Sequence, residues 1–116
     1  MGGSTSSYRK VEDAEVILLF GSNARETHPI YFQHVLAGVR KGARLFVIDP
    51  RRTSSARWAH QWLGLVAGTD ITLANAIGRE ILASGLENRS FIERATSGFE
   101  EYRASVESTS VRLEVE

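Results

Sequence analysis

The chain has 116 residues, of which 42% are hydrophobic, so its length and composition suit one small domain with a modest core. Fourteen Lys and Arg residues balance fourteen Asp and Glu residues, so no overall field attracts nucleic acid or an anionic membrane surface. The lack of cysteine excludes disulfide bonds, cysteine-bound iron–sulfur clusters and thiolate zinc sites in this chain. No apolar run has the length of a membrane span, and we expect a cytoplasmic chain.

The two ends of the chain differ from the sequence between them. Residues 1–7 are rich in Gly and Ser and lack the basic and apolar regions of a signal peptide, so we expect a flexible start. The alternating apolar pattern of 111–115 runs to the last residue without a turn or a helix cap. We therefore expect one domain over 8–107 and a truncated tail over 108–116.

The first half of the chain has the pattern of a strand, a helix and a second strand. The continuous apolar run 16–20 predicts a strand that is buried on both faces, and the run 44–48 repeats it before Asp49-Pro50 ends it. Between them, apolar residues at helical spacing predict a helix over 29–41. These apolar residues are Tyr31, Phe32, Val35, Leu36 and Val39. A crossover of this length makes the two strands parallel, which predicts an α/β fold with a short, mainly parallel, Rossmann-like sheet between helices.

The ends of this first helix also follow from the sequence. Thr27 is a candidate N-cap, and Pro29 suits the first helical turn. Gly42 stands where a helix often ends on a left-handed residue.

After the second strand, weaker sequence patterns predict further elements. We expect one helical turn over 53–57 and a third strand at the sheet edge over 61–66. A second firm helix is predicted over 71–84, where the poor helix formers Asn75 and Gly78 indicate close packing.

Two short helices are predicted near the C-terminus. Asn88 is the N-cap of the first, and Ser97 with Glu100 forms a capping box for the second. The residues that we expect these helices to bury are Phe91, Ile92, Ala95, Phe99, Tyr102 and Val106.

Three polar loops follow the predicted strands, at the sheet edge where open parallel sheets bind ligands. They span 21–28, 49–53 and 68–70. Gly21 lets the backbone approach a ligand closely, and the free amides at the Thr27 helix start attract a phosphate. The loops together predict a site for a nucleotide-like cofactor.

Charged side chains in the second and third loops suit parts of a nucleotide. Asp49 can bind a ribose hydroxyl, Arg51 and Arg52 can bind phosphate or base oxygens, and Asp70 can accept from N1 and N2 of a guanine. Each residue also has a purely structural interpretation as a turn former, a helix start or a solvated surface charge. The G-x-G-x-x-G fingerprint is absent, which disfavours a standard nicotinamide or flavin site.

No catalytic set is visible in the sequence. H-E-x-x-H, G-x-S-x-G and Walker motifs are absent, and His28, His34 and His60 lack the spacing of metal ligands. We therefore expect neither a catalytic residue nor a metal ligand in this chain.

Several segments, in order, resemble the molybdopterin oxidoreductases of the dimethyl sulfoxide reductase class. These segments are 13–23, 28–30, 47–53 and 67–70. The segment 98–103, Gly-Phe-Glu-Glu-Tyr-Arg, is most similar to the formate dehydrogenase catalytic subunits of that class. The resemblance extends over about residues 8 to 107.

The resemblance implies a cofactor, bis(molybdopterin guanine dinucleotide) with molybdenum or tungsten, and a Rossmann-like domain that holds the guanosine diphosphate arm of one pterin. The residues that would line this arm are Gly21, Ser22, Asn23, Ala24, Glu26, Thr27, His28, Asp49, Pro50, Arg51, Arg52, Thr53, Gly68, Thr69 and Asp70. Ala24 stands where the family often has proline, and we expect it to loosen the first loop.

The resemblance also implies a longer parent enzyme that oxidises formate to carbon dioxide by two-electron transfer. Family members carry an N-terminal iron–sulfur cluster, a cysteine or selenocysteine ligand to the metal and a second nucleotide-binding domain, all absent from this sequence. We therefore expect a fragment that is not catalytic alone and binds little or no cofactor by itself. Its expected partners are the remaining domains of the parent, the guanine dinucleotide and, through exposed interdomain surface, a second copy.

Two other functions stay open from the residues alone. One is a nicotinamide-type dinucleotide-binding dehydrogenase domain, against which the missing glycine fingerprint argues. The other is a non-catalytic interaction module of the same fold, which would use the 111–115 segment as an added edge strand.

Overall fold

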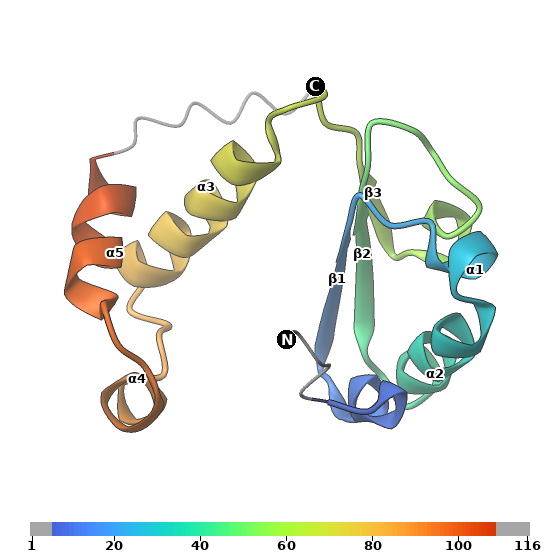
Figure 1. Cartoon of the computed structure of the whole chain (residues 1–116), viewed down its shortest axis with the longest axis horizontal. Helices are drawn as coiled ribbons and strands as arrows, with labels where there is room; N and C mark the ends of the chain where they lie inside the picture. Colours follow the sequence, from blue (N-terminus) through green and yellow to red (C-terminus); the bar gives the residue numbers. More distant parts are fainter. Residues whose placement is uncertain (1–5, 109–116) are drawn as a thin grey trace, which may run out of the picture. The chain divides into compact units, whose positions relative to one another are not determined.

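The computed structural model describes residues 6–108 (Figure 1). In chain order the elements are η1 (Tyr8–Asp13), β1 (Val16–Phe20), α1 (Ala24–Thr27), α2 (Pro29–Arg40), β2 (Arg44–Ile48), η2 (Ala56–Trp58), β3 (Gln61–Leu63), α3 (Asp70–Ala83), α4 (Arg89–Ala95) and α5 (Phe99–Glu107). Contacts divide the chain into two compact units, one before and one after the bond between Ala67 and Gly68. None of the described helices is long and apolar enough to cross a membrane.

The first unit contains a three-stranded parallel sheet in the order β1-β2-β3. Val16 pairs with Arg44 and Phe20 with Ile48, so β1 and β2 are aligned over their full length. The predicted parallel strand–helix–strand unit is therefore confirmed, and the chain is an α/β protein with a parallel sheet flanked by helices. The third strand lies at the edge as predicted, but it ends at Leu63 rather than at residue 66.

The core of this unit lies on one face of the sheet. Figure 1 shows α1 and α2 on the same side of the strands, and η1 packs against α2. The buried core side chains are Ile17, Leu19, Ala24, Phe32, Val35, Ala43, Leu45, Val47 and Ala56. Alternate residues of β1 enter this core because successive strand side chains point to opposite faces.

The prediction that β1 is buried on both faces is wrong. Val16, Leu18 and Phe20 are 55%, 43% and 36% exposed, whereas Ile17 and Leu19 are buried. The core that the described helices of this unit build lies against the Ile17 and Leu19 side of the strand only. Burial of the second face depends on what packs there, which the apolar run alone does not specify.

The boundaries of α2 are confirmed at two of three positions. Pro29 is its first residue, and Gly42 follows the C-cap with a φ of 111°. The expected N-cap at Thr27 is wrong, because the loop after β1 forms its own helical turn, α1, which ends at Thr27. His28 occupies the N-cap position of α2 and makes no side-chain cap hydrogen bond.

The second unit consists of helices. α3 packs against α5, and a Cβ added to Gly78 would collide with the Tyr102 hydroxyl, so the predicted close packing at Gly78 is confirmed. The Asn88 cap is also confirmed, since its Oδ1 accepts from the Phe91 amide at 3.0 Å. Val106 is fully buried, as expected.

Other expectations for this unit are wrong. Gly98, in the left-handed conformation, is the N-cap of α5, so Ser97 and Glu100 are out of register for a capping box. Phe91 and Tyr102 are 51% and 44% exposed rather than buried. The expected tail pattern over 111–115 lies outside the described residues, as does most of the expected flexible start.

Candidate functional site

Two of the three predicted loops come together at the carboxyl end of the sheet. β1 and β2 are parallel neighbours, so the loops after Phe20 and Ile48 leave the same edge. The Gly21 amide donates to the Ile48 carbonyl at 2.8 Å, which ties the start of the first loop to the end of β2. Gly21 has a φ of 55°, a backbone conformation that favours glycine.

Asn23 joins the first loop to the segment that follows the second. Its Oδ1 accepts from the hydroxyl groups of Ser54 at 3.0 Å and Ser55 at 3.1 Å. The fully buried Ser55 also accepts from the Arg25 amide at 3.0 Å. Asn23 thus fixes the geometry of the two loops through its side-chain oxygen.

Ser54 and Ser55 were not among the sequence-predicted site residues. They directly follow Thr53, the last residue of the predicted second loop, and that adjacency is the only signal in the sequence. A serine hydroxyl can hydrogen-bond to a distant side chain as readily as to the backbone of its own turn. The pairing with Asn23 is therefore visible only in the tertiary structure.

The amides around Thr27 do not form the predicted free helix start. The Glu26 and Thr27 amides donate to the Asn23 carbonyl, at 2.9 and 3.1 Å, and the His28 amide donates to the Ala24 carbonyl at 2.9 Å. These amides are therefore hydrogen-bonded within α1, a helix that the sequence did not predict. A phosphate therefore needs donors other than these three amides.

Asp49 is buried and holds its own loop. Its Oδ1 accepts from the Arg51 amide at 2.8 Å, and its carbonyl accepts from the Trp62 indole at 2.9 Å. The buried Thr53 accepts from the Ala56 amide through its hydroxyl at 3.4 Å. These bonds give both residues a structural role and fix the backbone of 49–53.

Three arginines lie on or beside these loops. Arg25 lies over the Trp58 ring at 5.8 Å, and Arg52 lies over the Trp62 ring at 6.0 Å. Arg51 has a side chain that is 80% exposed. Cation–π contacts hold a guanidinium in place while leaving its N–H donors available to an anion.

Glu26 is the acidic residue of the first loop. Hydrogen bonds from Ser54 and then from Asn23 lower the pKa of its carboxyl group. Glu26 is therefore ionised at neutral pH and places one negative charge near Arg25 and Arg51.

The three histidines occupy separate environments. His28 Nδ1 lies 2.9 Å from the Thr27 hydroxyl, and His60 Nδ1 accepts from the Leu45 amide at 3.0 Å. His34 pairs with Glu12 at 2.6 Å, on the contact between α2 and η1. Among residues 6–108, no group of three or more potential ligands is arranged to hold a metal ion.

The third predicted loop belongs to the second unit. Gly68 has a φ of 89°, Thr69 occupies the N-cap position of α3, and Asp70 is the first helical residue. The expected helix start next to Asp70 is confirmed. The structure thus brings together residues 21–28 and 49–53 within the first unit, and residues 68–70 open the second unit.

The fold and the order of these loops agree with comparisons to known proteins. Residues 2–105 match the molybdopterin oxidoreductase family. The chain belongs to this family. The match covers most of the chain, so it includes the sheet, both joined loops, α3, α4 and most of α5.

Relatives of this molybdopterin oxidoreductase domain include formate dehydrogenases. It is 36% identical over 106 residues to formate dehydrogenase H of Escherichia coli, covering 91% of this chain and 15% of that protein. It is 37% identical over 107 residues to F420-dependent formate dehydrogenase 1 subunit alpha of Methanococcus maripaludis, covering 92% of this chain and 16% of that protein. A nitrate reductase of Shewanella frigidimarina is 33% identical over 107 residues, covering 91% of this chain and 11% of that protein.

A solved structure supports the same relationship. Acetylene hydratase from Pelobacter acetylenicus matches with a TM-score of 0.70 and 28% identity, over 86% of this chain and 15% of that protein. The molybdopterin oxidoreductase domain thus spans 11–16% of the length of these relatives. Family membership implies a molybdopterin cofactor with molybdenum or tungsten.

Proposed function

We propose that this chain is a cofactor-binding part of a formate dehydrogenase-like enzyme and holds the guanosine diphosphate arm of one pterin of bis(molybdopterin guanine dinucleotide). Formate dehydrogenases at 33–37% identity support the formate dehydrogenase-like assignment. The relatives also include nitrate reductases and an acetylene hydratase, so the reaction is assigned by sequence similarity rather than by fold.

The observation that carries the proposal is the joining of two loops, with their arginines, at the carboxyl end of β1 and β2. Guanidinium groups suit the oxygens of a diphosphate because they donate in pairs to planar oxygen groups. An ideal Cβ at Gly21 meets no atom within 4 Å, so the backbone there borders open space. The residues present therefore fit the nucleotide arm.

In the proposal each residue has an individual role. Arg51 and Arg52 would bind the diphosphate, and Asp49, whose Oδ1 fixes the loop that carries them, would bind a ribose hydroxyl. Asp70 accepts from the guanine. The other residues of the proposed site, Gly21, Ser22, Asn23, Ala24, Glu26, Thr27, His28, Pro50, Thr53, Gly68 and Thr69, line the arm through the three loops.

When bound, the metal and its pterins supply two-electron redox chemistry. The residues of this chain bind and orient the nucleotide arm and take no part in the proton or electron transfers. In the proposal, formate oxidation, the iron–sulfur cluster and the metal ligand belong to the remaining domains of the parent protein, and the location is cytoplasmic.

Calorimetric titration of the chain with guanosine and adenosine diphosphates tests the guanine assignment. We expect weak binding of the guanine nucleotide and loss of the guanine preference in Asp70→Ala. The control is Asp13→Ala, which removes an exposed carboxylate of η1 outside the proposed site. Equal binding of both nucleotides by the unchanged chain contradicts the proposal, and tighter binding of reduced nicotinamide cofactor favours the dehydrogenase alternative.

A second measurement addresses the interaction-module alternative. Light scattering reports self-association, and thermal melting with and without guanosine diphosphate reports ligand binding. Dimerisation together with an unchanged melting temperature favours the interaction module. A monomer whose melting temperature rises with the nucleotide supports the cofactor-binding proposal.

A further inference from the structure

Arg25 is a cation of the first loop that is not among the sequence-predicted site residues. It stands in α1, and its amide donates to the hydroxyl of Ser55 at 3.0 Å. Ser55 is fully buried and follows the second loop in the chain. The backbone of Arg25 is therefore fixed to the segment that follows the second loop.

Trp58 holds the side chain of Arg25. The guanidinium carbon lies 5.8 Å from the centroid of the Trp58 ring. The Trp58 amide donates to the Ser55 carbonyl at 3.1 Å, so Ser55 anchors both residues of this cation–π pair. Trp58 is 51% exposed, so burial in the core does not account for its position. The ring therefore serves as a surface platform for the guanidinium.

The two arginines of the second loop are held differently from each other. Arg52 lies over the Trp62 ring at 6.0 Å, and the Trp62 indole donates to the Asp49 carbonyl at 2.9 Å. The Arg51 side chain is 80% exposed, and its Nε lies 3.7 Å from Asp49 Oδ1. A guanidinium that is already ordered on a ring loses less conformational entropy when it binds an anion. Arg25 and Arg52 are therefore better prepared for an anion than Arg51.

The N–H donors of Arg25 are available to a ligand. The neighbouring Glu26 carboxylate accepts hydrogen bonds from Ser54 and Asn23, and Arg25 acts on it through charge only. Among residues 6–108, Arg25 takes part in no ion pair. A planar guanidinium with free donors suits the oxygens of a phosphate group.

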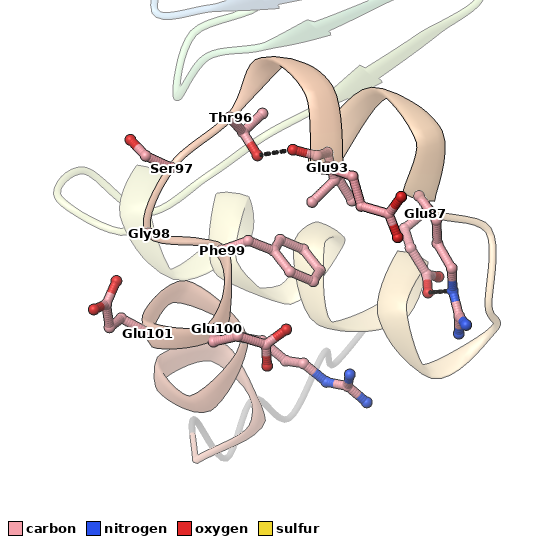
Figure 2. A pocket seen from close by; sticks show the side chains of 11 residues that line it. Glu87, Glu93, Thr96, Ser97, Gly98, Phe99, Glu100 and Glu101 are labelled. Atoms are coloured by element: carbon pink, nitrogen blue, oxygen red, sulfur yellow. Dashed lines mark hydrogen bonds and ion pairs between the residues drawn. The ribbon is translucent and has the colours of Figure 1, made fainter.

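A pocket in the second unit does not suit a phosphate. It has a volume of about 550 Å³ and lies between α4 and α5 (Figure 2). Figure 2 shows four glutamates in its lining, Glu87, Glu93, Glu100 and Glu101. Its arginines, Arg89 and Arg103, are each paired with a glutamate at 3.0 Å. The donors for a phosphate are therefore those of the first unit.

We propose that Arg25 is a further phosphate-binding residue of the nucleotide site and that Trp58 is the positioning residue that presents its guanidinium. The inference rests on the proposed function, and it adds a donor from the first loop to the arginines of the second. The guanidinium donates in pairs to the oxygens of the diphosphate. Arg25 contributes more to binding than Arg51, because its side chain is ordered before the ligand arrives.

NMR spectra of the whole chain without ligand test the role of Trp58. The Nε–H proton of Arg25, identified by its loss in Arg25→Lys, should be shifted upfield by the indole ring. Trp58→Leu should abolish this shift, and Trp58→Phe, which keeps an aromatic ring, should retain part of it. An unshifted Arg25 signal in the unchanged chain overturns the positioning role.

Titrations with guanosine diphosphate and with guanosine test the role of Arg25. Arg25→Ala should weaken binding of the diphosphate about tenfold, and Trp58→Leu should weaken it about two- to fivefold. Binding of guanosine, which carries no phosphate, should not change in either variant. The charge-matched control is Arg9→Ala, because η1 precedes β1 and lies at the opposite end of that strand from the loops. We expect the control to change the affinity by less than about twofold.

The outcomes separate this inference from the proposed function. If Arg25→Ala binds guanosine diphosphate within about twofold of Arg9→Ala, the inference fails and the proposed function stands. A larger loss of affinity in Arg51→Ala than in Arg25→Ala overturns the argument from side-chain order. Equal binding of guanosine and adenosine diphosphates contradicts the guanine assignment alone, because Arg25 acts on the phosphates that both carry. If the unchanged chain binds neither nucleotide, the proposed function and the binding role of Arg25 both fail.

Discussion

The joined loops of the first unit make a specific prediction about Ser55. Its hydroxyl donates to Asn23 Oδ1 and accepts from the Arg25 amide, and the residue is fully buried. Ser55→Ala removes both hydrogen bonds and leaves the Arg25 amide without this acceptor. A typical hydrogen bond contributes about 0.5–1.5 kcal/mol net. Because Arg25 is exposed, water can replace part of the lost bonding to its amide. We therefore expect the free energy of unfolding to fall by about 1–2 kcal/mol.

Ser54→Ala is the matched control. Ser54 also donates to Asn23 Oδ1, but it is only partly buried, and it accepts no bond from the Arg25 amide. We expect its loss to lower the free energy of unfolding by about 0.5–1 kcal/mol. Ser54→Ala also removes the hydrogen bond to Glu26, so the bond to the Arg25 amide is tested by the loss of Arg25 protection that only Ser55→Ala should cause.

Urea denaturation followed by tryptophan fluorescence measures this effect. Both tryptophans, Trp58 and Trp62, lie in the first unit, so the signal reports on the unit that contains the loops. Hydrogen exchange of the Arg25 amide gives a second measurement, because its protection should fall in Ser55→Ala and persist in Ser54→Ala. If Ser54→Ala is at least as destabilising as Ser55→Ala, or if Arg25 keeps its protection in both, the reasoning is refuted.

Two further predictions concern the contact between α2 and η1. Gly38→Ala should lower the free energy of unfolding by about 1 kcal/mol. A Cβ at this position would lie 3.0 Å from the Val11 carbonyl oxygen and 3.3 Å from Glu12 Cα. The resulting overpacking costs about 2 kcal/mol, which exceeds the gain of about 1 kcal/mol from the higher helix propensity of alanine. An unchanged or higher urea midpoint contradicts this. Hydrogen bonds from Lys41 and then His34 lower the pKa of Glu12 to about 2, so the stability that they contribute is present above pH 4.5, its ordinary pKa, and is lost as the pH falls toward 2. In Glu12→Gln the urea midpoint should therefore fall less between pH 4.5 and pH 2 than in the unchanged chain. In the control Glu15→Gln, which removes an exposed carboxylate, the midpoint should fall as much as in the unchanged chain.

The sequence by itself determined which segments form the main elements and how the first strands run. The apolar run 44–48 and the helix between Pro29 and Gly42 were predicted because strand and helix periods, proline geometry and glycine conformations act over a few residues. The length of the crossover then fixed the parallel pairing of β1 with β2. The ordered loop segments also indicated the family, which the comparisons confirm.

Only the tertiary structure decided how those elements are used. The sequence could not show that one face of β1 is exposed, because burial depends on the elements that pack against a strand. It could not pair Asn23 with Ser54 and Ser55, which lie about thirty residues away, because side-chain hydroxyls carry no periodic signal of their partners. The sequence likewise did not predict the short helix α1, because its four residues are too few to show a helical period. The amides predicted to bind a phosphate are instead hydrogen-bonded within this helix.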